Sequence, residues 1–169
     1  MSDIMKPRVE LSTPEKGWIT LTLDVDGQHF KLEFWHIPVD FVANLASAVA
    51  GIAEGRGTTA AEASAESNGR YVFEFTESSA TDTLRLVIRH WPSWTSRTTG
   101  GATMLDAEAP RLEFLRAFWR GFQNLRGRCE GADFESRWGS PLPTNAIDSI
   151  GDKARREHSL PASKRTSRV

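Results

Sequence analysis

Residues 111–125 read Arg-Leu-Glu-Phe-Leu-Arg-Ala-Phe-Trp-Arg-Gly-Phe-Gln-Asn-Leu, and this stretch decides the fold. Its large apolar side chains recur at intervals of three and four residues, which places them on one side of a helix. Charged and amide side chains fill the other side. So much aromatic bulk on one helix requires a broad apolar partner, most simply a β-sheet. The apolar side is formed by Leu112, Phe114, Leu115, Phe118, Trp119, Phe122 and Leu125.

Upstream, two hairpins and a second helix supply that partner. Residues 18–25 and 28–36 alternate between apolar and polar, and Asp26-Gly27 between them is a strong tight-turn signal. Residues 71–76 and 84–91 alternate in the same way, and 102–105 suggest a short further strand. An apolar stripe after Pro38 predicts a helix that runs to Ile52. Residues 56–68 have no large apolar residue and are interpreted as a loop, or at most a surface helical turn.

These elements predict an α+β fold, with an antiparallel sheet of four to five strands and two helices packed on one face. Residues 1–16 are expected to be an N-terminal extension, with a short edge strand at Val9 and Leu11. Residues 17–139 are expected to be a single α+β domain. Residues 140–169 are rich in Pro, Ser and charge, and we expect a basic, disordered tail.

The distribution of charge, the apolar runs and the cysteine count limit the classes of protein to which the chain can belong. Residues 1–139 hold 15 basic and 19 acidic side chains, whereas residues 140–169 hold 6 and 3. The net charge of −1 gives no prior for nucleic acid. The basic tail could touch phosphates weakly, but a solubilising end is the simpler interpretation, so nucleic acid is not the expected partner. Without an apolar signal segment or a membrane-length apolar run, we expect a cytoplasmic protein that does not enter a membrane. Cys129 is the only cysteine, so it cannot form an internal disulfide, and it cannot by itself anchor a thiolate zinc site.

No motif assigns a catalytic residue, a metal site or a cofactor. His36 and His90 end two strands in inward register, so a metal or proton-transfer site between them is the alternative that would make the chain a small-ligand-binding domain or an enzyme. Histidines that form hydrogen bonds at the rim of the core are the simpler interpretation.

The outward-facing positions of the strands form an open face that carries tryptophan and arginine. Trp and Arg dominate the energetics of protein interfaces, so this face is a candidate site for a protein partner. A tryptophan that closes one end of the core is the competing interpretation for Trp91 and Trp94. The candidate partner-binding residues are Trp35, Arg85, Arg89, Trp91 and Trp94.

The predicted elements follow one another as a Val25-Asp26-Gly27-Gln28 hairpin, a helix at 38–52, a second hairpin to Trp91 and a terminal helix at 114–125. This layout resembles small bacterial immunity proteins of polymorphic toxin systems. That resemblance implies a non-enzymatic protein that neutralises a cognate toxin domain by covering its surface. It carries over no individual residue. A structural subunit of a larger assembly is a further alternative, and a homodimer through the open face is also compatible with the sequence.

Overall fold

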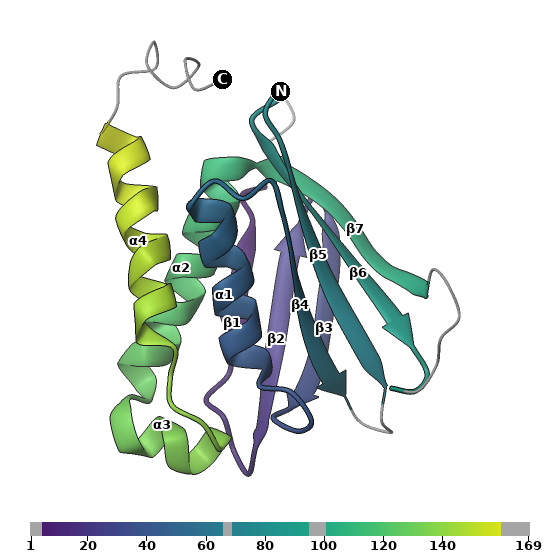
Figure 1. The fold of residues 1–169 in the computed structure, drawn as a ribbon, viewed down its shortest axis with the longest axis vertical. Helices are drawn as coiled ribbons and strands as arrows, with labels where there is room; N and C mark the ends of the chain where they lie inside the picture. Colours follow the sequence, from purple (N-terminus) through teal and green to yellow (C-terminus); the bar gives the residue numbers. More distant parts are fainter. Residues whose placement is uncertain (1–4, 66–68, 95–100, 160–169) are drawn as a thin grey trace.

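The computed structural model describes residues 5–65, 69–94 and 101–159 as a bent antiparallel sheet with helices along one side (Figure 1). In the described residues the sheet has seven strands and four helices accompany it, so the α+β class is confirmed and the expected strand and helix numbers are too low. The elements are β1 (Arg8–Leu11), β2 (Trp18–Val25), β3 (Gln28–Trp35), α1 (Phe41–Ala53), β4 (Thr58–Ala65), β5 (Arg70–Ser78), β6 (Thr83–Trp91), β7 (Ala102–Pro110), α2 (Arg111–Arg128), α3 (Gly131–Trp138) and α4 (Thr144–Ser159).

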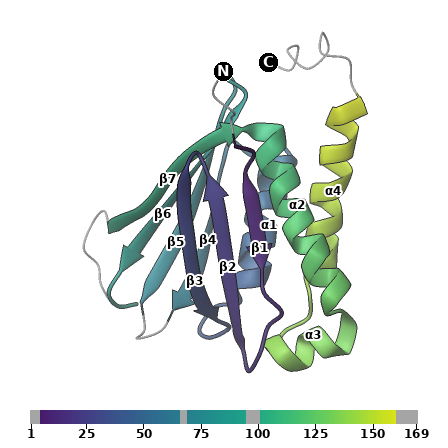
Figure 2. The same cartoon turned by 180° about the vertical axis from the view of Figure 1, so that it is seen from behind.

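The strands pair in chain order from β1 to β7, but one junction is short. Only Phe34–Ala65 and Trp35–Ser64 pair β3 with β4, whereas β2 and β3 pair along their whole length. The sheet therefore bends into two layers, with β1–β3 behind β4–β7 in Figure 1 and in front of them in Figure 2. At the far end of β3, Gln28 Nε2 donates a 2.7 Å hydrogen bond to the Asp106 carbonyl of β7.

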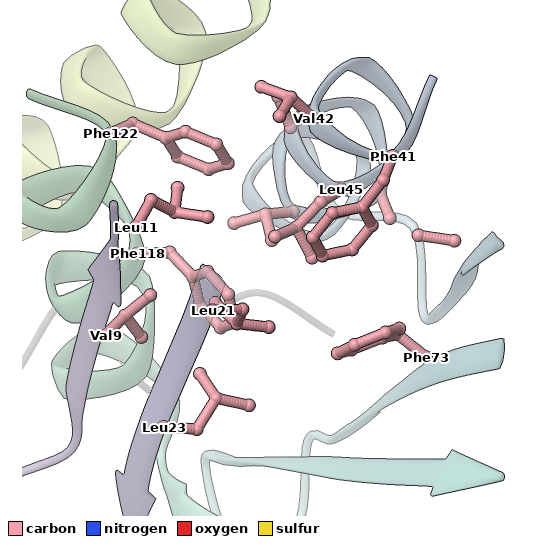
Figure 3. Packing of buried hydrophobic residues seen from close by; sticks show 14 of the residues in the cluster. Val9, Leu11, Leu21, Leu23, Phe41, Val42, Leu45, Phe73, Phe118 and Phe122 are labelled. Atoms are coloured by element: carbon pink, nitrogen blue, oxygen red, sulfur yellow. The ribbon is translucent and has the colours of Figure 1, made fainter. Parts of the chain in front are cut away.

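The core lies between the two layers and is closed by the helices (Figure 3). Phe34 of β3 contacts Phe41 of α1 and Phe73 of β5, with ring centroids 4.5 and 5.7 Å apart. Phe118 of α2 meets Phe75 at 5.6 Å. The prediction that the 111–125 helix buries its aromatic side against a sheet is therefore confirmed, although Leu112 and Trp119 are only partly buried.

Local sequence explains the first hairpin and the start of α1. Asp26 and Gly27 have φ of 52° and 70°, the left-handed conformation that a two-residue hairpin turn demands. Asp40 caps α1 by accepting a 3.1 Å hydrogen bond from the Ala43 N–H. The same carboxylate accepts a 2.9 Å bond from Trp138 Nε1, which attaches α3 to the start of α1.

Helix α2 packs tightly against the edge strand β1. Gly121 is required there, because a Cβ atom on it would lie 2.9 Å from the Val9 carbonyl oxygen. Further along α2, Arg128 donates a hydrogen bond to the Leu11 carbonyl. Val9 and Leu11 are buried, so the edge strand expected at these residues is confirmed and this part of the N-terminal extension belongs to the sheet.

The first residue of α2 joins four elements. Arg111 is 6% exposed, and its Nη1 donates to both carboxylate oxygens of Glu157 on α4, at 2.8 and 2.7 Å. Its Nη2 donates to the Ile52 carbonyl at the end of α1, at 3.1 Å. Its Nε lies 3.0 Å from a carboxylate oxygen of Glu77 on β5. A buried cation is thus surrounded by the partners that burial of a charge requires.

The expected loop at residues 56–68 is wrong where the chain forms β4. Its inward positions are small, with Ala61 and Ala63 buried, because α1 lies directly over them. Two side-chain hydrogen bonds join the elements: Thr59 Oγ1 donates to the Ala48 carbonyl at 2.8 Å, and Asn44 Nδ2 donates to the Glu62 carbonyl at 3.4 Å. Small residues at these positions allow α1 to pack closely on β4. Residues 66–68 lie outside the described residues.

The expected disordered tail is also wrong for most of its length, because residues 144–159 form α4. Ile147, Ile150 and Ala154 are buried at helical spacing and attach α4 to the outer side of α1 and α2. Gly151 lets the helix approach Trp119, since a Cβ there would lie 2.2 Å from the indole nitrogen. Residues 160–169 lie outside the described residues. None of the described helices is long and apolar enough to cross a membrane.

Candidate functional site

A row of side chains crosses five strands on the outer face of the sheet, at the end where the two layers meet. Trp18 pairs with Trp35, Trp35 with Ser64, Ser64 with Arg70, and Arg70 with Trp91. Directly opposed residues of antiparallel strands project to the same face, so these five side chains are neighbours in a line. We call this set, together with Trp94, the tryptophan row.

One half of the row is a pair of stacked indoles. The rings of Trp18 and Trp35 lie 5.9 Å apart with an interplanar angle of 14°. Both side chains are partly exposed, and within the described chain neither indole N–H has a hydrogen-bond partner. This half therefore offers apolar ring surface together with two free donors.

In the other half, Arg70 lies between two indole rings. Its guanidinium carbon is 5.0 Å from the Trp91 ring centroid and 6.0 Å from that of Trp94, within the range of cation–π attraction. Arg70 also donates to Glu62 at 3.0 Å. Ser64 is 2% exposed, and Trp94 Nε1 donates to its hydroxyl at 3.3 Å. The stack is thus held in place by contacts within the chain.

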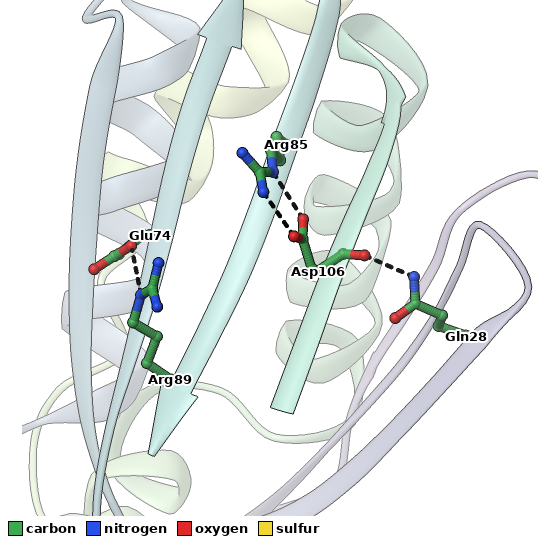
Figure 4. Close-up of polar contacts among 5 residues, drawn as sticks. All are labelled: Gln28, Glu74, Arg85, Arg89 and Asp106. Carbon is green, nitrogen blue, oxygen red and sulfur yellow. Dashed lines mark hydrogen bonds and ion pairs between the residues drawn. The ribbon is translucent and has the colours of Figure 1, made fainter. Parts of the chain in front are cut away.

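Beside the row, the outer face of β5–β7 carries ion pairs rather than free cations (Figure 4). Arg85 donates to both carboxylate oxygens of Asp106 through Nε and Nη2, at 2.7 and 2.6 Å. Arg89 Nε lies 3.3 Å from a carboxylate oxygen of Glu74. These hydrogen bonds lower the pKa of Asp106 and raise the pKa of Arg85. This face is therefore charged but locally neutral.

Two valines lie among these ion pairs on the outer face. Val72 and Val87 are 8% and 7% exposed although they point away from the core. Long charged side chains commonly cover apolar surface with their methylene groups in this way. On this face, charged side chains therefore cover the two valine side chains.

The structure separates the sequence-predicted candidates into two groups. Trp35, Trp91 and Trp94 lie in the tryptophan row, whereas Arg85 and Arg89 belong to the neighbouring ion pairs. Trp91 and Trp94 both lie outside the core. The tryptophan that is fully buried is Trp138 of α3, at 1% exposure.

Sequence reasoning missed Trp18 and Arg70 as members of the site. The turn at Asp26-Gly27 fixes the register of β2 on β3, so Trp18 could have been placed opposite Trp35 by counting outward from it. Arg70 precedes the alternating run that was interpreted as a strand. Its position opposite Trp91 depends on the length of the β5–β6 connection, which the sequence leaves open.

The two histidines occupy different packing environments. The His36 ring lies against Trp138, with centroids 5.9 Å apart, and against the backbone of Gly17 and Gly139. The His90 ring stacks on Tyr71, with centroids 4.5 Å apart. In the described part of the chain, no three His, Cys, Asp or Glu side chains are grouped so that they could hold a metal ion.

Comparison with known proteins leaves this site to be interpreted on its own chemistry. No protein-family model, no curated protein and no solved structure matches the chain.

Proposed function

We propose that this chain is a non-enzymatic protein-binding module whose interface is the tryptophan row. The observation that carries the proposal is the line of Trp18, Trp35, Arg70 and Trp91 across five strands on a face that no helix of the described chain covers. At about 4.8 Å per strand, the row extends about 19 Å along the sheet, which is comparable to the central part of a protein interface.

The chemistry of the row supports a protein partner. Trp and Arg are the residue types whose truncation most often removes binding energy. The row is already ordered by ring stacking and by the Ser64 hydrogen bond, so binding requires little further loss of side-chain entropy. The ion pairs of Arg85 and Arg89 beside it would form the polar rim that surrounds interface centres.

The narrower form of the proposal is an immunity function. In that case the partner is a toxin domain, and the module neutralises it by covering its surface. Support for this narrower form comes from the α+β layout with one open, tryptophan-bearing face.

The test is affinity capture from a lysate of the source organism, with chemical crosslinking, by the wild-type chain and by three variants. Trp35→Ala and Trp91→Ala remove ring surface from the two halves of the row. Arg120→Ala removes an exposed side chain on α2 and serves as the control. We expect a stoichiometric partner with the wild type and the control, and at least about tenfold lower recovery with the Trp variants. Circular dichroism must show that all variants are folded.

Equal recovery by all four proteins would exclude the row as the interface, and capture of nothing after crosslinking would contradict the binding-module proposal. The immunity form is tested on the purified partner. The wild type should abolish its toxic activity at one-to-one stoichiometry, and Trp35→Ala should not. A partner without toxic activity would contradict the immunity form alone.

A further inference from the structure

A polar cleft of about 470 Å³ lies on the outer face of the β1–β3 layer, next to the tryptophan row. It is open to solvent on one side. Strands β1 to β3 and the end of α2 contribute its walls. The side chains that matter for its chemistry are Ser12, Thr13, Thr20, Thr22, Lys31 and Arg128.

Four hydroxyl groups line this cleft, and they can act as hydrogen-bond donors. Ser12 Oγ accepts a 2.8 Å hydrogen bond from the Thr20 N–H, which fixes the hydroxyl and leaves its proton free to donate. The hydroxyls of Thr13, Thr20 and Thr22 have no hydrogen-bond partner within the described chain. Hydroxyls of β2 and of the connection between β1 and β2 thus converge on one space.

Two cations face the same space. Lys31 is directly opposite Thr22 in the β2–β3 pairing, and no carboxylate of the described chain lies within 4.0 Å of its ammonium. Arg128 is held by its hydrogen bond to the Leu11 carbonyl and likewise forms no ion pair among the described residues. Because one Arg128 nitrogen is used in that bond, its remaining N–H groups are left for a ligand.

The single carboxylate that lines the cleft is already neutralised. Glu10 forms an ion pair with Arg8 on the same strand. The charges that remain inside the cleft are therefore those of Lys31 and Arg128, although the body of the protein is mildly acidic. A positive, donor-rich cleft selects for an anion with many acceptor oxygens.

We propose that this cleft binds a small phosphate monoester. The phosphate oxygens accept from Lys31, Arg128 and the threonine hydroxyls, because a phosphate offers three strong acceptors and about two negative charges. The volume is several times that of a phosphate group, so the ligand includes an organic part, and the hydroxyl lining fits one that is itself polar. The proposal is independent of a protein partner at the tryptophan row.

The test is a two-dimensional NMR titration of the full chain at constant ionic strength with glycerol 3-phosphate, inorganic phosphate and glycerol. We expect saturable shifts at the amides of residues 10–13, 20–22 and 31 with glycerol 3-phosphate, with a Kd of about 1 mM or below. Inorganic phosphate should bind more weakly at the same amides, and glycerol should not saturate. Shifts that rise linearly, or that sodium chloride reproduces, would overturn the proposal.

Substitutions distinguish binding through the charge of Lys31 from a nonspecific effect of the ligand on the protein. Lys31→Gln should weaken binding at least about fivefold, and Lys31→Arg should restore it. Glu10→Gln should strengthen binding, because Arg8 then loses its ion-pair partner and the cleft becomes more positive. Lys153→Gln, a matched lysine substitution on α4, should leave the Kd unchanged, and so should Trp35→Ala in the neighbouring row. An unchanged Kd in Lys31→Gln would also overturn the assignment.

Discussion

Trp35 of β3 and Ser64 of β4 form one of the two residue pairs by which, in the described chain, β3 is paired with β4 at the bend of the sheet. The same pair lies in the middle of the tryptophan row, with Trp18 on one side and Arg70 on the other. The candidate interface is therefore located at the bend of the fold. A partner bound across the row would contact both layers at once.

Arg111 should be a principal determinant of stability. Arg111→Met leaves Glu77 and Glu157 without their shared cation in a mostly buried position, so the free energy of unfolding should fall by about 3 kcal/mol. Urea unfolding followed by circular dichroism measures this. The control is Arg137→Met, which breaks an exposed ion pair with Asp133 and should lower the free energy of unfolding far less than Arg111→Met. Equal losses in the two variants would contradict the role of Arg111.

Two glycines of α2 should respond to alanine in opposite directions. Gly121→Ala places a Cβ against the Val9 carbonyl and should destabilise the protein by about 1–3 kcal/mol. Gly127 has open space around it, so Gly127→Ala should stabilise the protein by up to about 1 kcal/mol through helix propensity. Thermal unfolding of both variants measures the difference. A stabilised Gly121→Ala would mean that β1 does not lie against α2 as described.

The inner and outer faces of β4 should differ in their tolerance of a larger side chain. Ala61 is 2% exposed and faces the core, so Ala61→Val should cost about 1–2 kcal/mol despite the strand preference of valine. Ala60 is exposed on the other face, and Ala60→Val should be neutral or slightly stabilising. Chemical denaturation of the two variants measures both effects. The reverse order of stabilities would mean that β4 faces the other way.

Stability should fall at alkaline pH through Cys129. Burial raises the pKa of this thiol above its ordinary value of 9.0, with a smaller contribution from its hydrogen bond to Asp133. The unfolded thiol ionises at its ordinary pKa while the folded thiol keeps its proton. The contribution of the thiol to the free energy of unfolding is therefore complete below pH 9.0, and it is lost as the pH rises toward the pKa of the folded state.

Urea unfolding of the wild type and of Cys129→Ala at about pH 8 and about pH 10 measures this contribution. The wild type should lose more stability than the variant between the two pH values. Tyr71, whose pKa burial also raises, is present in both proteins and cancels in the comparison. Identical pH dependence would show that Cys129 is not protected from ionisation.

Elements with large alternating or helical apolar patterns were predictable from the sequence. The Asp26-Gly27 hairpin, the β5–β6 strands and the aromatic side of α2 combine strong turn signals with large side chains, and they are confirmed. Here local sequence and tertiary packing agree.

The missed elements carry small or sparse apolar residues. In β4 the buried inward residues are alanines, which differ little in hydrophobicity from their polar neighbours, so their alternation is hard to recognise in the sequence. Only the packing of α1 over β4 explains why these residues are small. In α4 the few apolar positions lie in a polar, charged sequence, and the helix is anchored by Glu157 reaching Arg111 46 residues earlier. Such a long-range contact has no local signal.

The site was predictable only in part for the same reason. Alternation placed Trp35 and Trp91 on the outer face, but their alignment depends on the pairing of β3 with β4 through a single short junction. Arg85 and Arg89 were expected as partner contacts because their types are typical of interfaces. Their acidic neighbours Asp106 and Glu74 became apparent only from the strand register.

Each outer edge of the sheet is partly occupied by a side chain of the same molecule. Arg128 occupies the Leu11 carbonyl on β1, and Gln28 occupies the Asp106 carbonyl on β7. Unpaired strand edges are where sheets of neighbouring molecules join and aggregate. A molecule that adds a strand at either edge would therefore have to displace one of these two side chains from its carbonyl.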